Sequence, residues 1–238
     1  MRIVIIGDTH GEDNWKKILR DEDRADHIVF IGDYFDSFYH SGEEQILNFQ
    51  SIVSHKLHSP ERYTLLIGNH DFHYICPGER YSGYNDRMAF DFRDAVDGAI
   101  KDGALQMAKH IPGETGDGYL LTHAGVTRTW LKNNGISELA TPSMLAQLLH
   151  NKFLVEPLAF AFDRRDLSGC GEDKRQSPIW VRPEALLNDM YDSCVQIVGH
   201  TQQNKLTPDA ILDLIISDSR RQQQYIAIED GKRYAITV

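Results

Sequence analysis

The chain has 238 residues and a mass of 27.2 kDa, which is enough to bury a sizeable core. Its 41% hydrophobic and 25% charged residues exclude a wholly disordered or collagen-like chain. Lys and Arg number 25 against 35 Asp and Glu, so the formal net charge is −10 and the field of the molecule repels long nucleic acids.

The cysteines and the apolar runs bear on the compartment. Cys76, Cys170 and Cys194 show no CxxC spacing, unlike a disulfide framework or a cysteine-rich zinc site. The apolar runs are far shorter than the roughly 18 to 20 residues of a membrane span. The first of them, residues 3–6, is also too short for a signal peptide. We therefore expect a cytoplasmic protein that does not enter the membrane.

The first third of the chain alternates between two kinds of segment. Apolar runs that each end in glycine, followed by Asp or Asn, cover residues 2–7, 27–32 and 63–68. Such short continuous runs are typical of strands buried on both faces. Residues 43–58 carry apolar side chains at helical spacing, and residues 14–24 do so more weakly. The predicted order is strand, helix, strand, helix, strand.

The remaining elements are less regular. Residues 119–122 and 195–199 are short apolar runs that lead into a histidine, and residues 224–238 predict a hairpin around Asp230-Gly231. Residues 141–187 begin with a helical pattern and continue without a recognisable period. Because we find neither an internal repeat nor a long Pro- or Gly-rich linker, we expect one domain, residues 1–238, with a layered α/β sandwich fold.

Residue types that bind metals follow five of these strand ends. They occur in GDTHG, GDYFD, GNHD, LLTHAGV and GHTQ, as Asp8 and His10, Asp33 and Asp36, Asn69 and His70, His123, and His200. The carboxyl ends of neighbouring strands border one crevice, so these side chains are expected to converge. A glycine precedes four of the clusters, and we expect it to let the backbone turn sharply. Oxygen and nitrogen donors without thiolate favour Mn²⁺, Fe or Zn²⁺.

The clusters resemble the calcineurin-like metallophosphoesterase superfamily, whose motif blocks run GDxHG, GDxxD, GNH(D/E), an apolar strand ending in His, and GHT. They match in that order over residues 7–202. Any one block is also typical of a helix cap or a core histidine, but five in order are specific. GDYFD and GHTQ look most like the Ser/Thr protein phosphatase and diadenosine tetraphosphatase branch. The resemblance implies an α/β/β/α sandwich with a dimetal site at the strand carboxyl ends.

The resemblance also implies a role for each residue. Asp8, His10 and Asp33 would hold one divalent ion, and Asp33, Asn69, His123 and His200 the other, with Mn²⁺ the first expectation. Two ions about 3.5 to 4 Å apart clamp a phosphate and lower the pKa of a bridging water. His70 would protonate the leaving oxygen and Asp36 would orient its imidazole. The other histidines, His27, His40, His55, His58, His73, His110 and His150, are expected at the surface or in packing roles.

Two departures from the protein phosphatase pattern bear on the substrate. Those enzymes carry two arginines that grip the phosphate, where this chain has Ser37 and Ile67. Arg182, in SPIWVRP, resembles a segment that precedes the last ligand in related bacterial and phage phosphatases. We expect it to supply the missing cation or to lie in a surface ion pair. Weaker alternatives are Arg80, Arg87 and Arg128. Related branches also place a second histidine where this chain has Gln202.

Aromatic side chains flank the clusters, namely Tyr34, Phe35, Phe38, Tyr39, Phe72 and Tyr74. They either wall a pocket for an aryl group or a base or, as we expect for most, pack the loops.

The predicted activity is hydrolysis of phosphate esters, with monoesters first, by attack of a metal-bound hydroxide on a small phosphorylated substrate or a phosphoprotein. The alternative is hydrolysis of dinucleoside polyphosphates or of another phosphodiester or pyrophosphate bond. A catalytically silent binding scaffold is the remaining hypothesis, which the retention of all six ligand residues disfavours. The sequence carries no indication of the oligomeric state.

Overall fold

The computed structural model describes residues 1–238 except 77, 114–115, 208–213, 218–219 and 221–222. Two sheets form its centre. The first has the order β10-β9-β1-β2-β3-β4 and the second the order β5-β6-β7-β8. The strands of the first sheet are β1 (Arg2–Ile6), β2 (His27–Phe30), β3 (Tyr63–Leu66), β4 (Leu105–Gln106), β9 (Gln224–Glu229) and β10 (Lys232–Thr237). Those of the second are β5 (Ala108–Ile111), β6 (Tyr119–Thr122), β7 (Val195–Val198) and β8 (Leu214–Ile216).

Parallel pairing dominates both sheets. Strands β1 to β4 run parallel, as do β6, β7 and β8, while β9, β10 and β5 are antiparallel to their neighbours. The predicted strand runs, including the hairpin around Asp230-Gly231, all form strands. Because parallel strands point their carboxyl ends to the same edge, the loops after β1, β2 and β3 gather on one side of the molecule.

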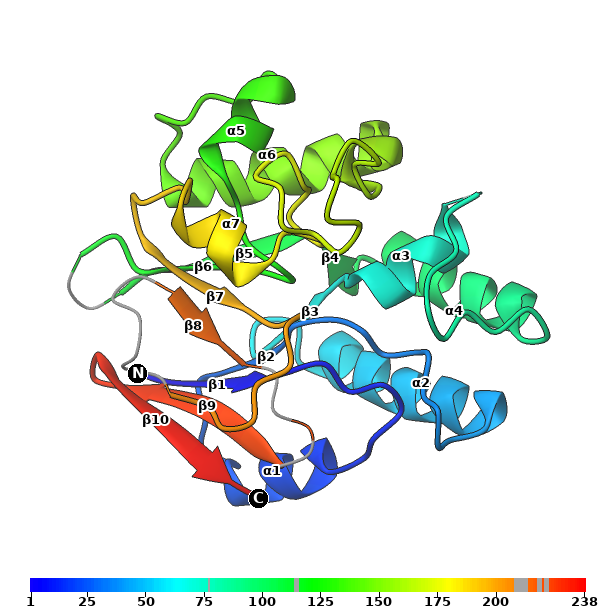
Figure 1. Ribbon diagram of the computed structural model, residues 1–238. Helices are drawn as coiled ribbons and strands as arrows, with labels where there is room; N and C mark the ends of the chain where they lie inside the picture. Colours follow the sequence, from blue (N-terminus) through cyan, green and yellow to red (C-terminus); the bar gives the residue numbers. More distant parts are fainter. Residues whose placement is uncertain (77, 114–115, 208–213, 218–219, 221–222) are drawn as a thin grey trace.

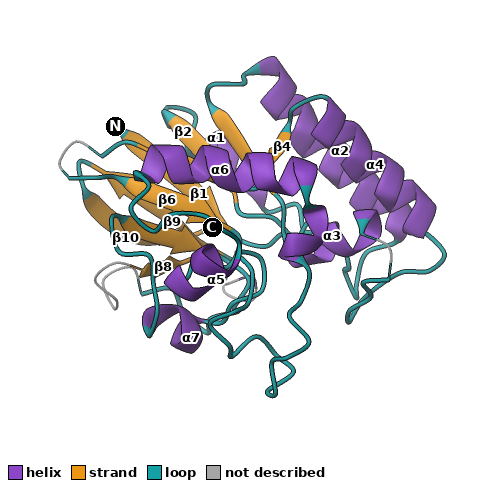
Figure 2. Cartoon of the chain, turned by 90° about the horizontal axis from the view of Figure 1, so that it is seen from above, coloured by secondary structure: helices purple, strands orange, loops and turns teal. Residues whose placement is uncertain are grey.

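Helices cover the outer faces of the sheets. They are α1 (Trp15–Asp21), α2 (Gly42–His58), α3 (Asn69–Ile75), α4 (Ala89–Lys101), α5 (Arg128–Asn133), α6 (Pro142–Val155), α7 (Pro183–Leu187) and the 3₁₀ turn η1 (Pro157–Phe160). In Figure 1, α1 and α2 lie on one side of the strands and α5 and α6 on the other. Figure 2 shows α6 running across the strands, and α2 beside α4, which it contacts.

The hydrophobic core is divided into clusters, one between the two sheets and a larger one that includes helix residues. Along β1, Ile3 and Ile5 belong to a cluster that also holds Leu121 and Ile197 of the second sheet. Val4 and Ile6, which point to the opposite face, belong to the cluster that includes the helix residue Trp15. Side chains alternate between the two faces of a strand, so β1 contacts the partner sheet and the helix layer at once. The architecture is the expected α/β/β/α sandwich.

Candidate metal centre

The side chains expected to bind metal all follow strand ends. Asp8 and His10 follow β1, Asp33 follows β2, Asn69 follows β3, His123 follows β6 and His200 follows β7. All six are buried. The structure therefore brings together, between the two sheets, residues that are up to 192 positions apart in sequence.

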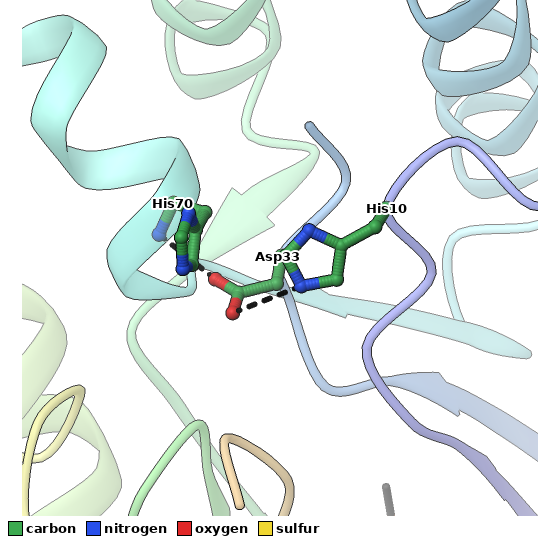
Figure 3. A group of neighbouring side chains, drawn as sticks. All are labelled: His10, Asp33 and His70. Carbon is green, nitrogen blue, oxygen red and sulfur yellow. Dashed lines mark hydrogen bonds and ion pairs between the residues drawn. The ribbon is translucent and has the colours of Figure 1, made fainter. Parts of the chain in front are cut away.

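Asp33 lies at the centre of this cluster. Its Oδ2 is 3.7 Å from Nε2 of His10, and its Oδ1 accepts the backbone N–H of His70 at 2.9 Å (Figure 3). Oδ2 also lies 3.3 Å from Nε2 of His123. Ligand atoms of His10, Asp33 and His70 lie within 4.8 Å of one another, and so do those of Asp33, His123 and His200. Asp33 belongs to both groups, as a residue bridging two ions would.

Asn69 and Asp8 complete the cluster. Oδ1 of Asn69 is 3.0 Å from Nε2 of His123 and 2.9 Å from Nδ1 of His200. Oδ1 of Asp8 accepts the backbone N–H of His200 at 3.1 Å and lies 4.0 Å from Nδ1 of His123. Asp8 thus lies beside His123 and His200 but belongs to neither of the two groups that contain Asp33.

The surroundings of the imidazoles fit metal binding. Nδ1 of His10 is 2.5 Å from the carbonyl oxygen of Phe35, and Nδ1 of His123 is 2.9 Å from that of Ile31. A carbonyl can only accept, so each Nδ1 donates its proton and leaves Nε2 for an ion, as in many metal sites. Nε2 of His200 is buried and has no hydrogen-bond partner among the residues described. With two carboxylates and one amide oxygen, this donor set suits a divalent transition-metal ion.

In the metal-free cluster, burial and nearby carboxylates shift the pKa values of two histidines in opposite directions. Burial lowers the pKa of His10 to about 3. Burial acts in the same direction on His123, but the carboxylates of Asp33 and Asp8 raise its pKa to about 9. Without ions, protonated His123 therefore balances the charge of Asp33, and a metal ion must displace that proton.

The backbone at the site adopts an uncommon conformation. Among the non-glycine residues described, six have positive φ, and four of these belong to the site: His10 (43°), Asp33 (56°), Asp36 (67°) and His200 (61°). Such residues persist only where the surrounding structure enforces them. We therefore expect contacts of the surrounding structure to hold these loops in place.

The glycines before the ligands act differently from our expectation. Only Gly32 has a positive φ, 112°. A Cβ on Gly68 would lie 2.1 Å from Oδ1 of Asp33, and one on Gly199 would lie 2.4 Å from Oδ1 of Asp8. These two positions are glycine because a carboxylate packs against them, and the positive φ occurs at the ligands themselves.

The imidazole of His70 contacts the carboxylate of Asp36, the residue expected to orient it. Its Nδ1 is 2.7 Å from Oδ2 of Asp36, which is buried. Burial lowers the pKa of His70, but the carboxylates of Asp33 and Asp36 outweigh it and raise the pKa above its ordinary value. The raised pKa favours the protonated imidazole, which is the form that a general acid needs.

Two further groups hold Asp36, and one of them is a histidine that the sequence analysis assigned to surface or packing roles. Nε2 of His73, which is fully buried, lies 2.7 Å from Oδ2 of Asp36, and the hydroxyl of Tyr74 donates to Oδ1. The spacing of His70 and His73 on α3 was a usable signal, because residues three apart lie on the same helix face.

Asp71 is a second residue that the sequence analysis missed. Its carboxylate accepts the backbone N–H groups of Asp33 at 2.8 Å, of Tyr34 at 2.8 Å and of Gly68 at 2.9 Å. It is fully buried and links the loop after β2 to the first turn of α3. An acidic residue at the third position of a helix suggests such a role, but its partners in the β2 loop become visible only in the fold.

Arg182 lies beside the last ligand. Its Nη1 is 3.2 Å from the carbonyl oxygen of His200 and 3.1 Å from Oγ1 of Thr201, and its Nε donates to the carbonyl of Cys170 at 3.0 Å. The alternatives lie on the surface: Arg80 pairs with Asp86, Arg128 pairs with Asp192, and Arg87 is exposed.

A cavity of about 320 Å³ opens next to the metal cluster. Its lining includes His10, Asp36, Phe38, Tyr39, Gln202 and Arg220. Of the six aromatic residues named from the sequence, Tyr34, Phe35, Phe72 and Tyr74 are buried, whereas Phe38 and Tyr39 are 78% and 90% exposed. Most of the aromatic residues therefore pack the loops, as expected, and two line the cavity. Arg220 was not anticipated by the sequence analysis.

Solved structures share the fold at low sequence identity. A cold-active protein-tyrosine phosphatase from the psychrophile Shewanella sp. is 16% identical with a TM-score of 0.61, covering 99% of this chain and 80% of its own. A protein serine/threonine phosphatase from Saccharomyces cerevisiae is 14% identical with a TM-score of 0.56, covering 100% and 80%. A candidate diadenosine tetraphosphatase is 14% identical with a TM-score of 0.51, covering 99% and 93%.

No curated protein matches the chain. Within the residues that the structure describes, no helix is both long and apolar enough to cross a membrane. The model of the calcineurin-like phosphoesterase family matches residues 1–204, which include every strand end that carries a ligand residue. The chain is therefore a member of the calcineurin-like phosphoesterase family and a metal-dependent hydrolase.

Proposed function

We propose that this phosphoesterase acts on phosphate monoesters, with two divalent ions held by the buried cluster around Asp33. One ion would be held by Asp8, His10 and Asp33, and the other by Asp33, Asn69, His123 and His200. When bound, the ions neutralise the phosphate charge and activate the attacking water. Mn²⁺ is proposed first because the donors are carboxylates, imidazoles and one amide without thiolate.

The chain itself supplies the acid. A bond forms between the water oxygen and phosphorus, the ester P–O bond breaks, and the leaving oxygen takes a proton from His70. Asp36 holds Nδ1 of His70, so Nε2 is the nitrogen that donates this proton. The product alcohol leaves, and the imidazole regains a proton from solvent.

Arg182 is proposed to contact the phosphate. Ile67 and Ser37 stand where related phosphatases carry arginine, and neither side chain is a cation. Ile67 is buried in the core, and Oγ of Ser37 accepts the backbone N–H groups of Tyr39 and His40. Arg182 is half-buried and its guanidinium lies against the backbone of His200. This places a positive charge next to the second group of ligands.

The observation that carries the proposal is the position of Asp33. One carboxylate reaches imidazoles of His10 and His123 and also anchors the backbone of His70, so the ligands and the acid share a single centre. A site that only stabilised the fold would not require a proton-donating histidine beside a cluster of metal-binding side chains.

The test is hydrolysis by purified protein that has been stripped with a chelator and reloaded with Mn²⁺, Mg²⁺, Ni²⁺ or Zn²⁺. The panel contains aryl phosphates, bis-aryl phosphates, phosphopeptides and dinucleoside polyphosphates. We expect activity on monoesters, its loss with chelator and its loss in Asp33→Asn. Full activity in excess chelator would contradict the proposal, and a metal-loaded protein inactive on the whole panel would favour the binding scaffold.

A preference for dinucleoside polyphosphates is the second candidate. The cavity beside His10 carries exposed aromatic side chains and an arginine, which suit a base and a further phosphate. Faster hydrolysis of diadenosine tetraphosphate than of any monoester would favour it.

A further inference from the structure

The cavity beside the metal cluster has walls whose chemistry differs from that of the ligands. We propose that it binds the leaving group of the substrate and selects an aromatic ring that carries a further anionic group. This inference rests on the proposed phosphoesterase function and adds to it a specificity for the leaving group.

The position of the cavity identifies which part of the substrate it would hold. Two of its lining residues, His10 and Asp36, also surround the acid. Asp36 contacts Nδ1 of His70 at 2.7 Å, and the ring of His10 is 5.0 Å from the ring of His70. Because the acid must reach the leaving oxygen, the leaving group extends from His70, and the cavity begins there.

The aromatic wall is held in place although it is exposed. Phe38 and Tyr39 follow Ser37, whose Oγ accepts the N–H groups of Tyr39 and His40 at 3.1 Å each. The N–H of Ser37 donates to Oε1 of Gln45 on α2 at 3.0 Å. A tight turn anchored to a helix therefore presents two neighbouring aromatic side chains to solvent, beside the reaction centre. Stacking against a substrate ring removes such surfaces from water at little entropic cost.

Arg220 contributes a positive charge to the lining of the cavity. Of its acidic lining residues, Asp36 is engaged by His70 and His73, and Oε2 of Glu12 lies 3.4 Å from Nε2 of His40. The guanidinium of Arg220 and the amide of Gln202 line the same cavity, and both suit a carboxylate or phosphate on the leaving group.

The size of the cavity limits the occupant. About 320 Å³ is near the lower end of the range for small-molecule sites. A single ring with its anionic substituent fits this description, and an extended polymer does not.

The test distinguishes the two walls of the cavity with the Mn²⁺-loaded protein and three substrates. These are ethyl phosphate, phenyl phosphate and 4-carboxyphenyl phosphate. The variants are Phe38→Ala with Tyr39→Ala, and Arg220→Gln. Each kcat/KM is divided by that of the wild type on the same substrate, so the intrinsic reactivity of the esters cancels.

The double aromatic variant should lose about fivefold to tenfold more on phenyl phosphate than on ethyl phosphate. Arg220→Gln should lose about tenfold more on 4-carboxyphenyl phosphate than on phenyl phosphate, and Arg220→Lys should recover part of that loss. Matched controls are Phe90→Ala, an exposed phenylalanine on α4, and Arg93→Gln on the same helix, which should change no ratio. Metal content and thermal midpoint are measured on every sample.

Two sources offer this chemistry, a nucleotide and a phosphotyrosine with acidic neighbours. When these two substrates are compared with each other, a loss in Arg220→Gln on diadenosine tetraphosphate but not on an acidic phosphotyrosine peptide supports the nucleotide, and the reverse supports the peptide. Equal losses on all esters would overturn the leaving-group role while leaving the phosphoesterase function intact. A wild type that hydrolyses none of them would instead refute the function on which the inference rests.

Discussion

His10, Asp33, Asp36 and His200 each combine a proposed role in the site with a backbone conformation that L-residues rarely adopt. At two of these positions the reason is visible in the contacts. The N–H of Asp33 donates to the carboxylate of Asp71, and the N–H of His200 donates to that of Asp8. Asp33 and His200 thus each donate the backbone N–H to an acid while the side chain belongs to the site. The strain is therefore compensated by hydrogen bonds that also orient the ligands.

His70→Ala tests the assignment of the acid. Loss of the donated proton should slow turnover by about 10² to 10⁴ for esters with poor leaving groups, and much less for aryl esters with good ones. The measurement is the slope of log kcat against the pKa of the leaving group, which should become steeper. His58→Ala, which removes an exposed histidine from α2, is the control. A slope identical to that of the wild type would exclude His70 as the acid.

Metal binding should depend on pH through His123. Its pKa is raised to about 9 in the metal-free cluster, so below that pH an ion must displace a proton. The apparent affinity for Mn²⁺ should therefore rise with pH, approaching about tenfold per pH unit between pH 6 and 8, with release of about one proton.

Calorimetric titration in two buffers of different ionisation enthalpy measures that release directly. An affinity that is flat over this pH range, with no proton released, would show that His123 is already neutral in the metal-free protein.

At the scale of elements, the strand ends were predictable and several helices were not. The runs at 2–7, 27–32, 63–68, 119–122 and 195–199 became β1, β2, β3, β6 and β7 because continuous apolar runs suit strands covered on both faces. Helix α3 has seven residues, too few to show a period, and begins at the ligand Asn69. Helix α4 buries Phe92, Val96 and Ala99 at helical spacing, a signal that the sequence analysis did not use.

The convergence of the proposed ligands was predictable for a related reason, and the contacts that support them were not. Asp33 and His123 follow strands, so topology alone brings them to one edge. Asp71 and His73 act through partners that lie in the loop after β2, on another element. Their roles depend on how that loop packs on α3, which short-range patterns do not encode.

Asp71→Asn tests how the loop after β2 is tied to α3. The amide keeps one accepting oxygen in place of two, so at least one of the buried N–H groups of Asp33, Tyr34 and Gly68 loses its partner. We expect a loss of about 1 to 3 kcal/mol in the free energy of unfolding and weaker metal binding, since Asp33 shifts.

Urea denaturation and Mn²⁺ titration of the same samples measure both effects. Asp91→Asn, an exposed acid in the first turn of α4, should change neither. If Asp71→Asn binds metal as tightly as the wild type, Asp71 does not position Asp33.

At the scale of the whole molecule, one ionic cluster joins both ends of the chain. Glu22 accepts Nε and Nη2 of Arg2 on β1 at 2.6 Å each and the hydroxyl of Tyr225 on β9 at 2.7 Å. Burial raises the pKa of Glu22, but the hydrogen bonds from Arg2 and Tyr225 outweigh it and hold the pKa below its ordinary value. The lowered pKa means that the cluster stabilises the ionised, folded form.

Glu22→Gln should therefore cost stability in a pH-dependent way. A group with a lowered folded pKa contributes fully above its unfolded pKa, near 4.5 here, and loses that contribution as the pH falls through the folded value. At pH 7 the variant should lose about 1.5 to 3 kcal/mol in the free energy of unfolding.

Below pH 4.5 the difference from the wild type should shrink, as followed by urea denaturation across pH 3 to 8. Asp86→Asn breaks an exposed pair with Arg80 and should cost less than about 1 kcal/mol at any pH. A Glu22→Gln penalty that is constant with pH would mean that hydrogen bonding without charge accounts for the effect.

The hydrogen bond from His200 to Asp8 also constrains how the protein is made. It joins residues 192 positions apart, one on each sheet, so the site closes a loop that includes most of the chain. Contacts of such sequence separation form late in folding, because their loop entropy is lost before any contact compensates for it. During synthesis, the early strand ends emerge with Asp8, His10 and Asp33 long before His200 exists. We therefore expect tight metal binding only after His200 has been synthesised, and metal uptake in a pulse-labelled translation reaction should lag behind synthesis of the strand ends that carry Asp8, His10 and Asp33.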